Sequence, residues 1–419
     1  MSKLGLALSG GGSKGAYEIG VCMALKKLNK KIDIVTGTSI GAINGVFIVQ
    51  NDLRKALKLW KKISFKTIYK ENDFPLDKNM KLPEIYTTYI KNFINDGGTD
   101  ASKLREVFNK NFNAKKFFRS KIDYGLVTYN LTQNIPVFKE KKYLNKDNIA
   151  DYVIASASCY PAFKPHIINN EMYIDGGYYD NLPINLAIGM GAEEVIAVDL
   201  RAIGLKKSLT DKNIPVTYII PRNHLSSFLI FDSNSAKQSI RFGYNDTMKT
   251  FNKLDGDKLT FKKGQLVKNY NKYNEKYEKN LHKVFNNFKN DLLTKLFKSK
   301  LFESFLIKKA TYNDFNYIVE KAGLFFGFEE STIYKINTYN KGLLSQLANT
   351  EAVDINKTVS KIKRKEIDKL IDSRQIIKYF YDSILEGEIT KTTKFIPIFM
   401  DELLVAIYLI TIKGKYLAL

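Results

Sequence analysis

A serine nucleophile is the first chemistry that the sequence offers. Residues 37–41 read GTSIG, the G-x-S-x-G pattern, with Ser39 at its centre and Gly37 and Gly41 on either side. A strand-like run precedes the pattern and a helix-like run rich in small residues follows it, which is the context of a nucleophile elbow. Such a turn exposes the serine hydroxyl, and the N-terminus of the following helix directs N–H groups at the reaction centre. The pattern alone is common, and its position between a strand and a helix makes it more specific.

An activated serine needs a base. The chain has only three histidines, and none lies in the context of a catalytic triad: His166, His224 and His282. A carboxylate can serve instead, and Asp175 follows a strand-like run at the glycine turn Gly176-Gly177. A carboxylate with an ordinary pKa of about 4 is a weak base for serine. We therefore expect an apolar wall beside Asp175 that raises the pKa of its carboxyl group.

A glycine-rich loop, GGGSKG, follows the first strand-like run. Its members are Gly10, Gly11, Gly12, Ser13, Lys14 and Gly15. The loop fits G-x-G-x-x-G, but a dinucleotide site also needs an acid at the end of the second strand, and Asp33 stands at the start of that strand. A phosphate-binding P-loop would need its lysine directly after a glycine and before Ser or Thr, which Lys14 does not satisfy. Exposed N–H groups here could instead stabilise a transient oxyanion.

The elements that must position these groups alternate as in an α/β sheet. We predict strands at 4–8, 32–35, 123–130, 135–138, 172–175, 195–199 and 216–221, and helices at 15–28 and 40–50. Residues 51–120 read as basic and mostly helical, and could form a cap over the site. Strand signals become rare beyond about residue 260, so we place a domain boundary near residue 250.

In this order, GGGSKG, GTSIG and DGG resemble the patatin-like phospholipase family. Residues 155–165, ASASCYPAFKP, resemble the family's segment before its catalytic Asp. The resemblance covers about residues 1–250. It implies an α/β fold, a three-layer domain with a central, mostly parallel sheet, and hydrolysis of fatty-acyl esters of membrane lipids through a covalent acyl-enzyme. The sequence has no His/Cys grouping and no EF-hand loop, so we expect no metal and a calcium-independent enzyme, and we expect no cofactor.

The resemblance assigns roles to the motif residues. Ser39 would be the nucleophile and Asp175 its proton acceptor, a dyad without histidine. Gly10, Gly11, Gly12 and Ser13 would form the oxyanion hole. The supporting positions would be Lys14, Gly15, Gly37, Gly41, Gly176 and Gly177.

The net charge of +23, from 66 Lys+Arg against 43 Asp+Glu, favours anionic partners. A biased composition with solvated lysines is the plainer alternative. Lysine dominates and no nucleic-acid-binding motif is present, so we expect an acyl-lipid substrate and peripheral contact with an anionic membrane, and no nucleic acid. Two cysteines, Cys22 and Cys159, exclude a disulfide framework by count.

Residues 251–419 carry no motif of the family. They read as a basic, mainly helical region, with an apolar stripe at helical spacing from Tyr273 to Leu296. A core-packed stripe with solvated lysines and a membrane-surface helix both fit this pattern. A lid, a membrane anchor, an oligomerisation surface and a sensor that gates activity all remain open as roles for this region.

No secretory signal and no uncharged apolar stretch of membrane-spanning length is visible. The nearest stretch, 395–411, is interrupted by Pro397 and by Asp401-Glu402. We expect a cytoplasmic protein that contacts membranes peripherally. Two functions of other classes stay open: a non-catalytic lipid- or nucleotide-binding module on the same fold, and NAD binding at the first glycine loop.

Overall fold

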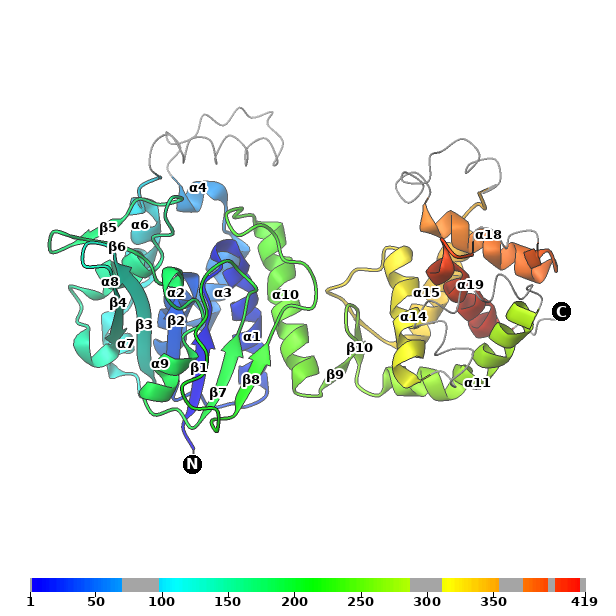
Figure 1. The fold of residues 1–419 in the computed structure, drawn as a ribbon, viewed down its shortest axis with the longest axis horizontal. Helices are drawn as coiled ribbons and strands as arrows, with labels where there is room; N and C mark the ends of the chain where they lie inside the picture. Colours follow the sequence, from blue (N-terminus) through cyan, green and yellow to red (C-terminus); the bar gives the residue numbers. More distant parts are fainter. Residues whose placement is uncertain (1, 70–97, 287–310, 354–371, 391–395, 415–419) are drawn as a thin grey trace. The chain divides into compact units, whose positions relative to one another are not determined.

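The structure is a computed structural model that describes residues 2–69, 98–286, 311–353, 372–390 and 396–414 (Figure 1). It divides the chain into two compact units, Met1–Thr250 and Phe251–Leu419. Part of the region expected to form a cap, residues 70–97, lies outside the described residues.

The first unit is built on an eight-stranded mixed sheet in the order β5-β6-β3-β2-β1-β7-β8, with β4 beside β3. The strands are β1 (Leu4–Leu8), β2 (Ile34–Thr38), β3 (Asp123–Asn130), β4 (Ile135–Glu140), β5 (His166–Ile168), β6 (Glu171–Asp175), β7 (Glu194–Val198) and β8 (Val216–Ile219). Four pairings, among β3, β2, β1, β7 and β8, are parallel, and the three that involve β4, β5 and β6 are antiparallel. The predicted α/β fold is confirmed, and β5 is the strand of this sheet that the sequence did not predict.

Helices cover both faces of the sheet. Their bounds are α1 (Ala16–Lys27), α2 (Ile40–Val49), α3 (Leu53–Lys61), α4 (Phe65–Ile68), α6 (Ser102–Asn111), α7 (Ala114–Arg119), α8 (Ile149–Ser156), α9 (Ile184–Gly189) and α10 (Ser233–Thr250). On one face, Ala187 of α9 packs with Ala7, Ile34 and Val195. On the other, α2 approaches so closely that a Cβ on Gly45 would lie 3.1 Å from Val35. This gives three layers, helix, sheet and helix.

One edge of β3 is shared by two strands that run towards each other. Residues 123–127 of β3 pair with β2 in parallel, and residues 128–130 pair with β6 in antiparallel fashion. The last residue of β2, Thr38, lies opposite Val127, and the last residue of β6, Asp175, lies opposite Thr128. The carboxyl ends of β2 and β6 therefore meet, and whatever follows β2 faces Asp175.

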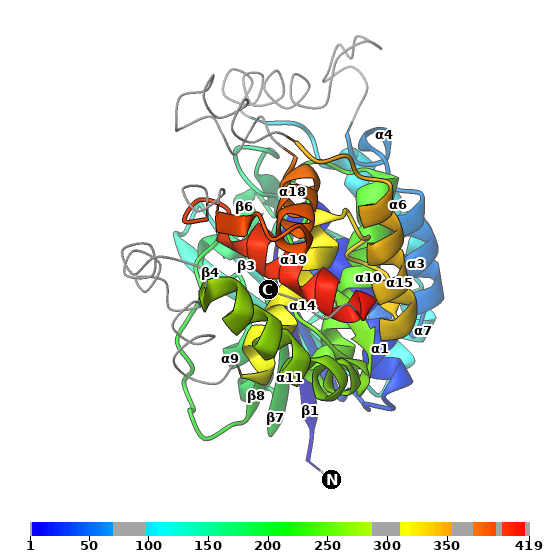
Figure 2. The ribbon, with the colours of Figure 1, turned by 90° about the vertical axis from the view of Figure 1, so that its right-hand side faces the viewer.

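The second unit contains α11 (Gln265–Asn286), α14 (Tyr312–Phe325), α15 (Ile336–Ala348), α18 (Ser373–Leu385) and α19 (Met400–Lys413). Helix α19 runs through the middle of this unit and is buried on all sides from Leu403 to Ile410 (Figure 2). Tyr277, Leu281 and Val284 of the predicted stripe belong to this core, and the stripe beyond residue 286 lies outside the described residues. No helix within the described ranges is long and apolar enough to cross a membrane.

The second unit also contains a small three-stranded sheet, which the prediction of a mainly helical region did not include. Strands β9 (Leu254–Asp255), β10 (Thr260–Lys262) and β11 (Ile333–Tyr334) pair in the order β11-β10-β9. They are two or three residues long, so they show no alternating pattern that could be read from the sequence.

Candidate active site

Ser39 occupies the sharp turn between β2 and α2. Its backbone has φ 57° and ψ −123°, a positive φ that is unusual for a residue with a side chain. The N–H of Ser39 donates to Oγ of Ser156 at 2.9 Å, and that hydroxyl donates to the carbonyl of Val127 at 2.6 Å. The buried Ser156 of α8 thus stabilises the strained turn through these two hydrogen bonds.

The turn also depends on the absence of side chains at Gly37 and Gly41. A Cβ on Gly37 would lie 2.4 Å from the backbone of Gly41, and a Cβ on Gly41 would lie 2.5 Å from the carbonyl oxygen of Leu8. These close approaches bring the N-terminus of α2 against the carboxyl end of β1. The glycines of the predicted elbow are therefore required by packing.

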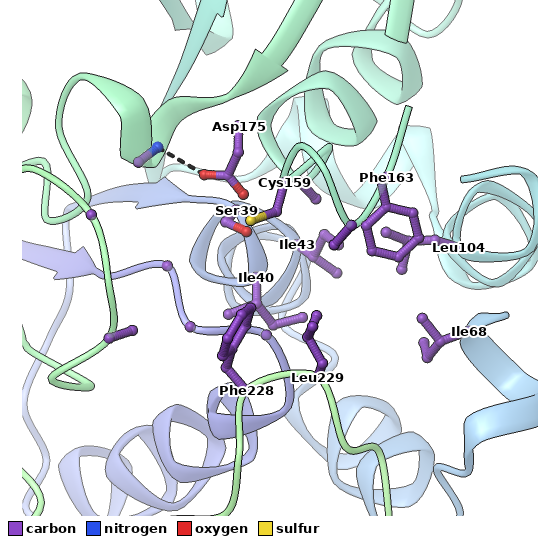
Figure 3. A pocket seen from close by; sticks show the side chains of 18 of the residues that line it. Ser39, Ile40, Ile43, Ile68, Leu104, Cys159, Phe163, Asp175, Phe228 and Leu229 are labelled. Carbon is purple, nitrogen blue, oxygen red and sulfur yellow. Dashed lines mark hydrogen bonds between the residues drawn. The ribbon is translucent and has the colours of Figure 1, made fainter. Parts of the chain in front are cut away.

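Asp175 ends β6 and faces Ser39, with the two side chains pointing towards each other (Figure 3). The carboxylate is 5% exposed, and its Oδ1 accepts a hydrogen bond from the N–H of Gly177 at 2.7 Å. Burial raises the pKa of Asp175 to about 6, while hydrogen bonds from the Ser39 side chain and the Gly177 N–H oppose the rise. Cys159 beside this pair stays neutral, because burial raises the pKa of its thiol to about 12. The raised pKa predicted for Asp175 is confirmed.

The glycine turn after Asp175 is tightly packed against the sheet. A Cβ on Gly176 would lie 2.2 Å from the carbonyl oxygen of Val127, and one on Gly177 would lie 2.9 Å from Oδ1 of Asn181. The DGG motif thus places the carboxylate against β3.

The glycine loop offers fewer donors than the sequence suggested. The N–H of Gly10 donates to the carbonyl of Asn181 at 3.0 Å, and the N–H of Ser13 donates to the carbonyl of Phe228 at 2.8 Å. Within the described part of the chain, the N–H groups of Gly11 and Gly12 have no such partner, and both residues line the cavity at Ser39. Of the four expected donors, Gly11 and Gly12 are therefore the two whose N–H groups are available at the cavity, and their role as an oxyanion hole stays a prediction.

Gly12→Ala tests how closely this loop is packed. Gly12 has φ 56°, and a Cβ there would lie 2.1 Å from the carbonyl oxygen of Phe228. We expect a loss of about 1–3 kcal/mol in the free energy of unfolding and a fall of at least about tenfold in ester turnover. Gly191→Ala is the matched control, because Gly191 has φ 96° but only one distant neighbour, at 4.0 Å. Chemical denaturation and a soluble-ester assay would measure both; equal turnover in the two variants would contradict the expectation.

Asn181 is the site residue that the sequence did not reveal. It is buried, and its side chain packs against three glycines, Gly10, Gly177 and Gly204. Its carbonyl accepts from Gly10, and its Nδ2 donates to the Gly10 carbonyl at 3.4 Å. Asn181 thereby joins the glycine loop to the turn that carries Asp175. In the sequence, Asn181 follows Gly177 by four residues, and this closeness to the DGG motif is the one local feature that points to its role.

Lys14 and Gly15 connect the glycine loop to different parts of the chain. Nζ of Lys14 donates to the carbonyl of Arg201 at 3.4 Å, and burial lowers the pKa of this lysine. The carbonyl of Gly15 accepts from Nδ2 of Asn44 at 3.0 Å, and Oδ1 of Asn44 accepts from Nε1 of Trp60 at 3.0 Å. Gly15 and Trp60 thus tie the glycine loop and α3 to the helix that follows Ser39.

The competing sites receive no support from the geometry. The carboxylate of Asp33 accepts from the N–H of Leu4 at 3.1 Å, at the amino end of the strands, away from the glycine loop. His166 pairs with Asp151 at 3.0 Å, and neither His166 nor His224 lines the cavity at Ser39. In the described segments, no group of three or more His, Cys, Asp or Glu side chains could hold a metal ion.

A mainly apolar cavity of about 860 Å³ opens at Ser39 and Asp175. Its far wall comes from α3, α4 and α6, and Ile68 and Leu104 lie on the side away from Ser39 (Figure 3). Phe228, Leu229 and Phe231 close another side. Cavities of this volume are typical of sites that enclose a small molecule, and this lining suits a hydrocarbon chain.

Comparison with known proteins also indicates a phospholipase-type domain in the first unit. Residues 6–188 match the family model described as patatin-like phospholipase. "Lysophospholipase nte1" of Aspergillus terreus is 31% identical over 220 residues, and "Lysophospholipase NTE1" of Candida albicans is 29% identical over 217 residues. Each alignment covers 51% of this chain but only 12% and 14% of the respective relative, so the chain spans about an eighth of their length.

Two solved structures resemble the chain more distantly. VipD from Legionella pneumophila is 13% identical, with a TM-score of 0.37 over 99% of this chain and 92% of that one. The type III effector ExoU is 11% identical, with a TM-score of 0.32 over 95% and 80%. Both scores are low, so the fold assignment rests on the strands and helices described above. Together with the sequence relatives, the family match identifies residues 6–188 as a patatin-like phospholipase domain.

Proposed function

We propose that this chain is a lipid acyl hydrolase of the phospholipase A type. Ser39 attacks the carbonyl carbon of a fatty-acyl ester while Asp175 takes the hydroxyl proton. The tetrahedral intermediate collapses, the proton passes to the leaving alcohol, and an acyl-Ser39 ester remains. Water, deprotonated by Asp175, then attacks this ester. As the bond from the acyl carbon to Oγ of Ser39 breaks, Asp175 returns the proton to Oγ, and the fatty acid and the free serine are released.

The oxyanion of the tetrahedral intermediate would be stabilised by Gly11 and Gly12. Their N–H groups are at the cavity beside Ser39, and the N-terminus of α2 adds its dipole. A donor of this kind contributes about 2.7–4 kcal/mol to transition-state stabilisation. No step of this mechanism needs a cofactor or a metal ion.

The observation that carries the proposal is the placement of a strained serine opposite a buried carboxylate of raised pKa, at the head of an apolar cavity. The apolar cavity is suited to bind an acyl chain, and the Ser39–Asp175 pair is suited to cleave an ester. The described part of residues 51–120 supplies α3, α4 and α6 to the cavity wall, which supports its role as a substrate cap. The substrate is proposed to be a phospholipid or another acyl lipid, and the place of action to be an anionic membrane surface reached from the cytoplasm.

The pH dependence of ester turnover should report on Asp175. Because the carboxylate form is the base, kcat/KM is expected to fall as the pH drops through about 6, approaching a tenfold loss per pH unit. Asp180→Asn is the control, since burial also raises the pKa of Asp180 to about 6 but Asp180 does not line the cavity. A profile that is flat between pH 5 and 7, or an inflection that disappears in the control variant, would rule out Asp175 as the titrating base.

The depth of the cavity should set the preferred chain length. Leu104 is buried on α6 and lines the far wall, so Leu104→Trp would fill space there. We expect turnover of long-chain esters to fall about tenfold, with little change for a short-chain ester that ends before this wall. A series of p-nitrophenyl esters measures this directly. Equal losses for short and long chains would contradict the proposed path of the acyl chain.

Lipid profiling tests the proposed function as a whole. Phospholipid vesicles are incubated with the wild type or with Ser39→Ala, and fatty acids and lysolipids are measured by mass spectrometry. The proposal predicts acid release by the wild type alone. Vesicle binding by both proteins without any release by the wild type would instead support a lipid-binding module on this fold.

A further inference from the structure

We propose that the cavity docks, mouth first, on the surface of an anionic phospholipid bilayer through an apolar rim formed by Tyr160, Tyr178, Ile203 and Leu205. This inference rests on the proposed function, because the rim would deliver lipid to the cavity. It adds which face of the first unit meets the membrane and which side chains enter it.

All four rim residues line the cavity, yet all four are exposed. Ile203 is 89% exposed and Leu205 is 59% exposed, whereas most other aliphatic residues that line the cavity are buried. The rim is continuous: the hydroxyl of Tyr178 donates to the carbonyl of Tyr160 at 2.5 Å, and the N–H of Leu205 donates to the carbonyl of Gly177 at 2.9 Å. A group of exposed apolar side chains at a cavity mouth is typical of an interaction surface.

The loop that carries Ile203 and Leu205 is held in place. Leu205 is fixed on both sides of its backbone, because its carbonyl also accepts from the N–H of Asn181 at 2.6 Å. Gly204 packs against Asn181 so closely that a Cβ there would lie 2.7 Å away. The loop therefore presents its apolar side chains outward from a rigid base, and does so beside the turn that carries Asp175.

The charge around the rim matches an anionic surface. Residues 201–207, RAIGLKK, contain three cations and no acid: Arg201, Lys206 and Lys207. Lys206 pairs with Asp199 at 2.6 Å, and Nζ of Lys207 lies 3.7 Å from the ring centre of Tyr179. Cations that flank inserted apolar side chains are typical of segments that bind the headgroup region. Tyrosines suit the same depth, since their rings are apolar and their hydroxyls polar.

A bilayer fits this rim better than a protein partner does. The rim opens directly into an apolar cavity, so an acyl chain could pass from the bilayer to Ser39 without crossing bulk water. Two protruding aliphatic side chains flanked by cations give little flat area for a protein interface, but they suit insertion between lipid headgroups.

An environment-sensitive fluorophore tests which face docks. The full chain is labelled through Ile203→Cys in a Cys159→Ser background, and Cys22 is buried. With vesicles containing phosphatidylglycerol, we expect a blue shift and an intensity gain at position 203. The matched control is Ile167→Cys in the same background, since Ile167 is 65% exposed on β5 but does not line the cavity. No change at position 203, or equal changes at both positions, would overturn the proposal.

Rim variants then separate docking from catalysis. The double variant of the rim, Ile203→Ser with Leu205→Ser, should weaken binding to phosphatidylglycerol vesicles at least about tenfold. The double variant of the flanking cations, Arg201→Gln with Lys207→Gln, should weaken this binding about fivefold for each cation removed. The control, Ile167→Ser with Met172→Ser, changes a cross-strand pair of exposed residues away from the cavity and should bind like the wild type.

Turnover of a soluble short-chain ester by Arg201→Gln with Lys207→Gln should stay within about twofold of the wild type, because neither side chain lines the cavity. Unchanged vesicle binding in the rim variants would overturn the docking proposal even if lipid hydrolysis is found. A wild type that shows rim-dependent binding but no hydrolysis would leave docking supported and the proposed function wrong.

Discussion

Ser39→Ala should abolish fatty-acid release, with a loss of at least about 10⁴-fold in kcat. In the proposed mechanism the hydroxyl oxygen of Ser39 forms the covalent bond to the acyl group, and in the described part of the cavity lining it is the one alcohol that faces the buried Asp175. The change removes one oxygen from a buried position, so folding should be retained. Single-turnover release from a fluorogenic acyl lipid measures the loss, and circular dichroism with thermal unfolding checks the fold.

Ser156→Ala is the informative companion to this variant. Ser156 is also buried and touches Ser39, but only through the backbone N–H of Ser39. We expect kcat of Ser156→Ala to fall far less, by about tenfold to a hundredfold, because the variant only shifts the position of the nucleophile. If Ser39→Ala kept more than a few per cent of wild-type turnover, another nucleophile would have to act.

Asp175→Asn should lower kcat by about 10³- to 10⁴-fold without unfolding the protein. The amide is nearly the same size as the carboxylate and can still accept the hydrogen bond from Gly177, but it cannot take a proton. Burial disfavours the charged form of Asp175, so its replacement by a neutral group should not lower the thermal unfolding midpoint. Parallel measurement of turnover and of thermal unfolding therefore separates a catalytic loss from a structural one.

Asp180→Asn provides the matched control here too. Asp180 is buried five residues further on, its pKa is raised similarly, and its carboxylate accepts from the N–H of Leu182 at 3.2 Å. We expect this variant to stay within about tenfold of wild-type turnover. Comparable losses in both aspartate variants would mean that the turn as a whole, and not the Asp175 carboxylate, is what turnover requires.

The sequence predicted the parts of the site that are local. The elbow at Ser39 depends on two glycines, a preceding strand and a following helix, all within the sixteen residues from Ile34 to Val49. The ends of β1, β3, α1 and α2 were predicted to within two residues. Strand β2 was placed two to three residues too early, because its last three residues, 36–38, read as the turn. The position of Asp175 at a strand end was equally visible.

What the sequence could not supply are the partners of backbone groups. Whether Gly10 or Gly11 offers a free N–H is decided by the carbonyl of Asn181, more than 170 residues away. The N–H of Ser13 is engaged by Phe228 in the same way. Such pairings depend on how loops meet at the end of a sheet, and no periodicity or residue type records them. The meeting of β2 and β6 on one edge of β3 is likewise a property of the topology.

The rim is a second case of this kind. Ile203 and Leu205 in RAIGLKK would pass as ordinary loop residues, and only their exposure beside the cavity gives them a role. The large basic excess suggested a membrane partner, but it could not say which face meets the lipid.

The central claim is that Ser39 is an activated nucleophile, and covalent trapping tests it most directly. The full-length protein is treated with a long-chain alkyl fluorophosphonate at neutral pH, and the adduct is mapped by peptide mass spectrometry. We predict one adduct, on Ser39, that is absent in Ser39→Ala and strongly slowed in Asp175→Asn. No adduct on the wild type, or an adduct on a different serine, would contradict the assignment.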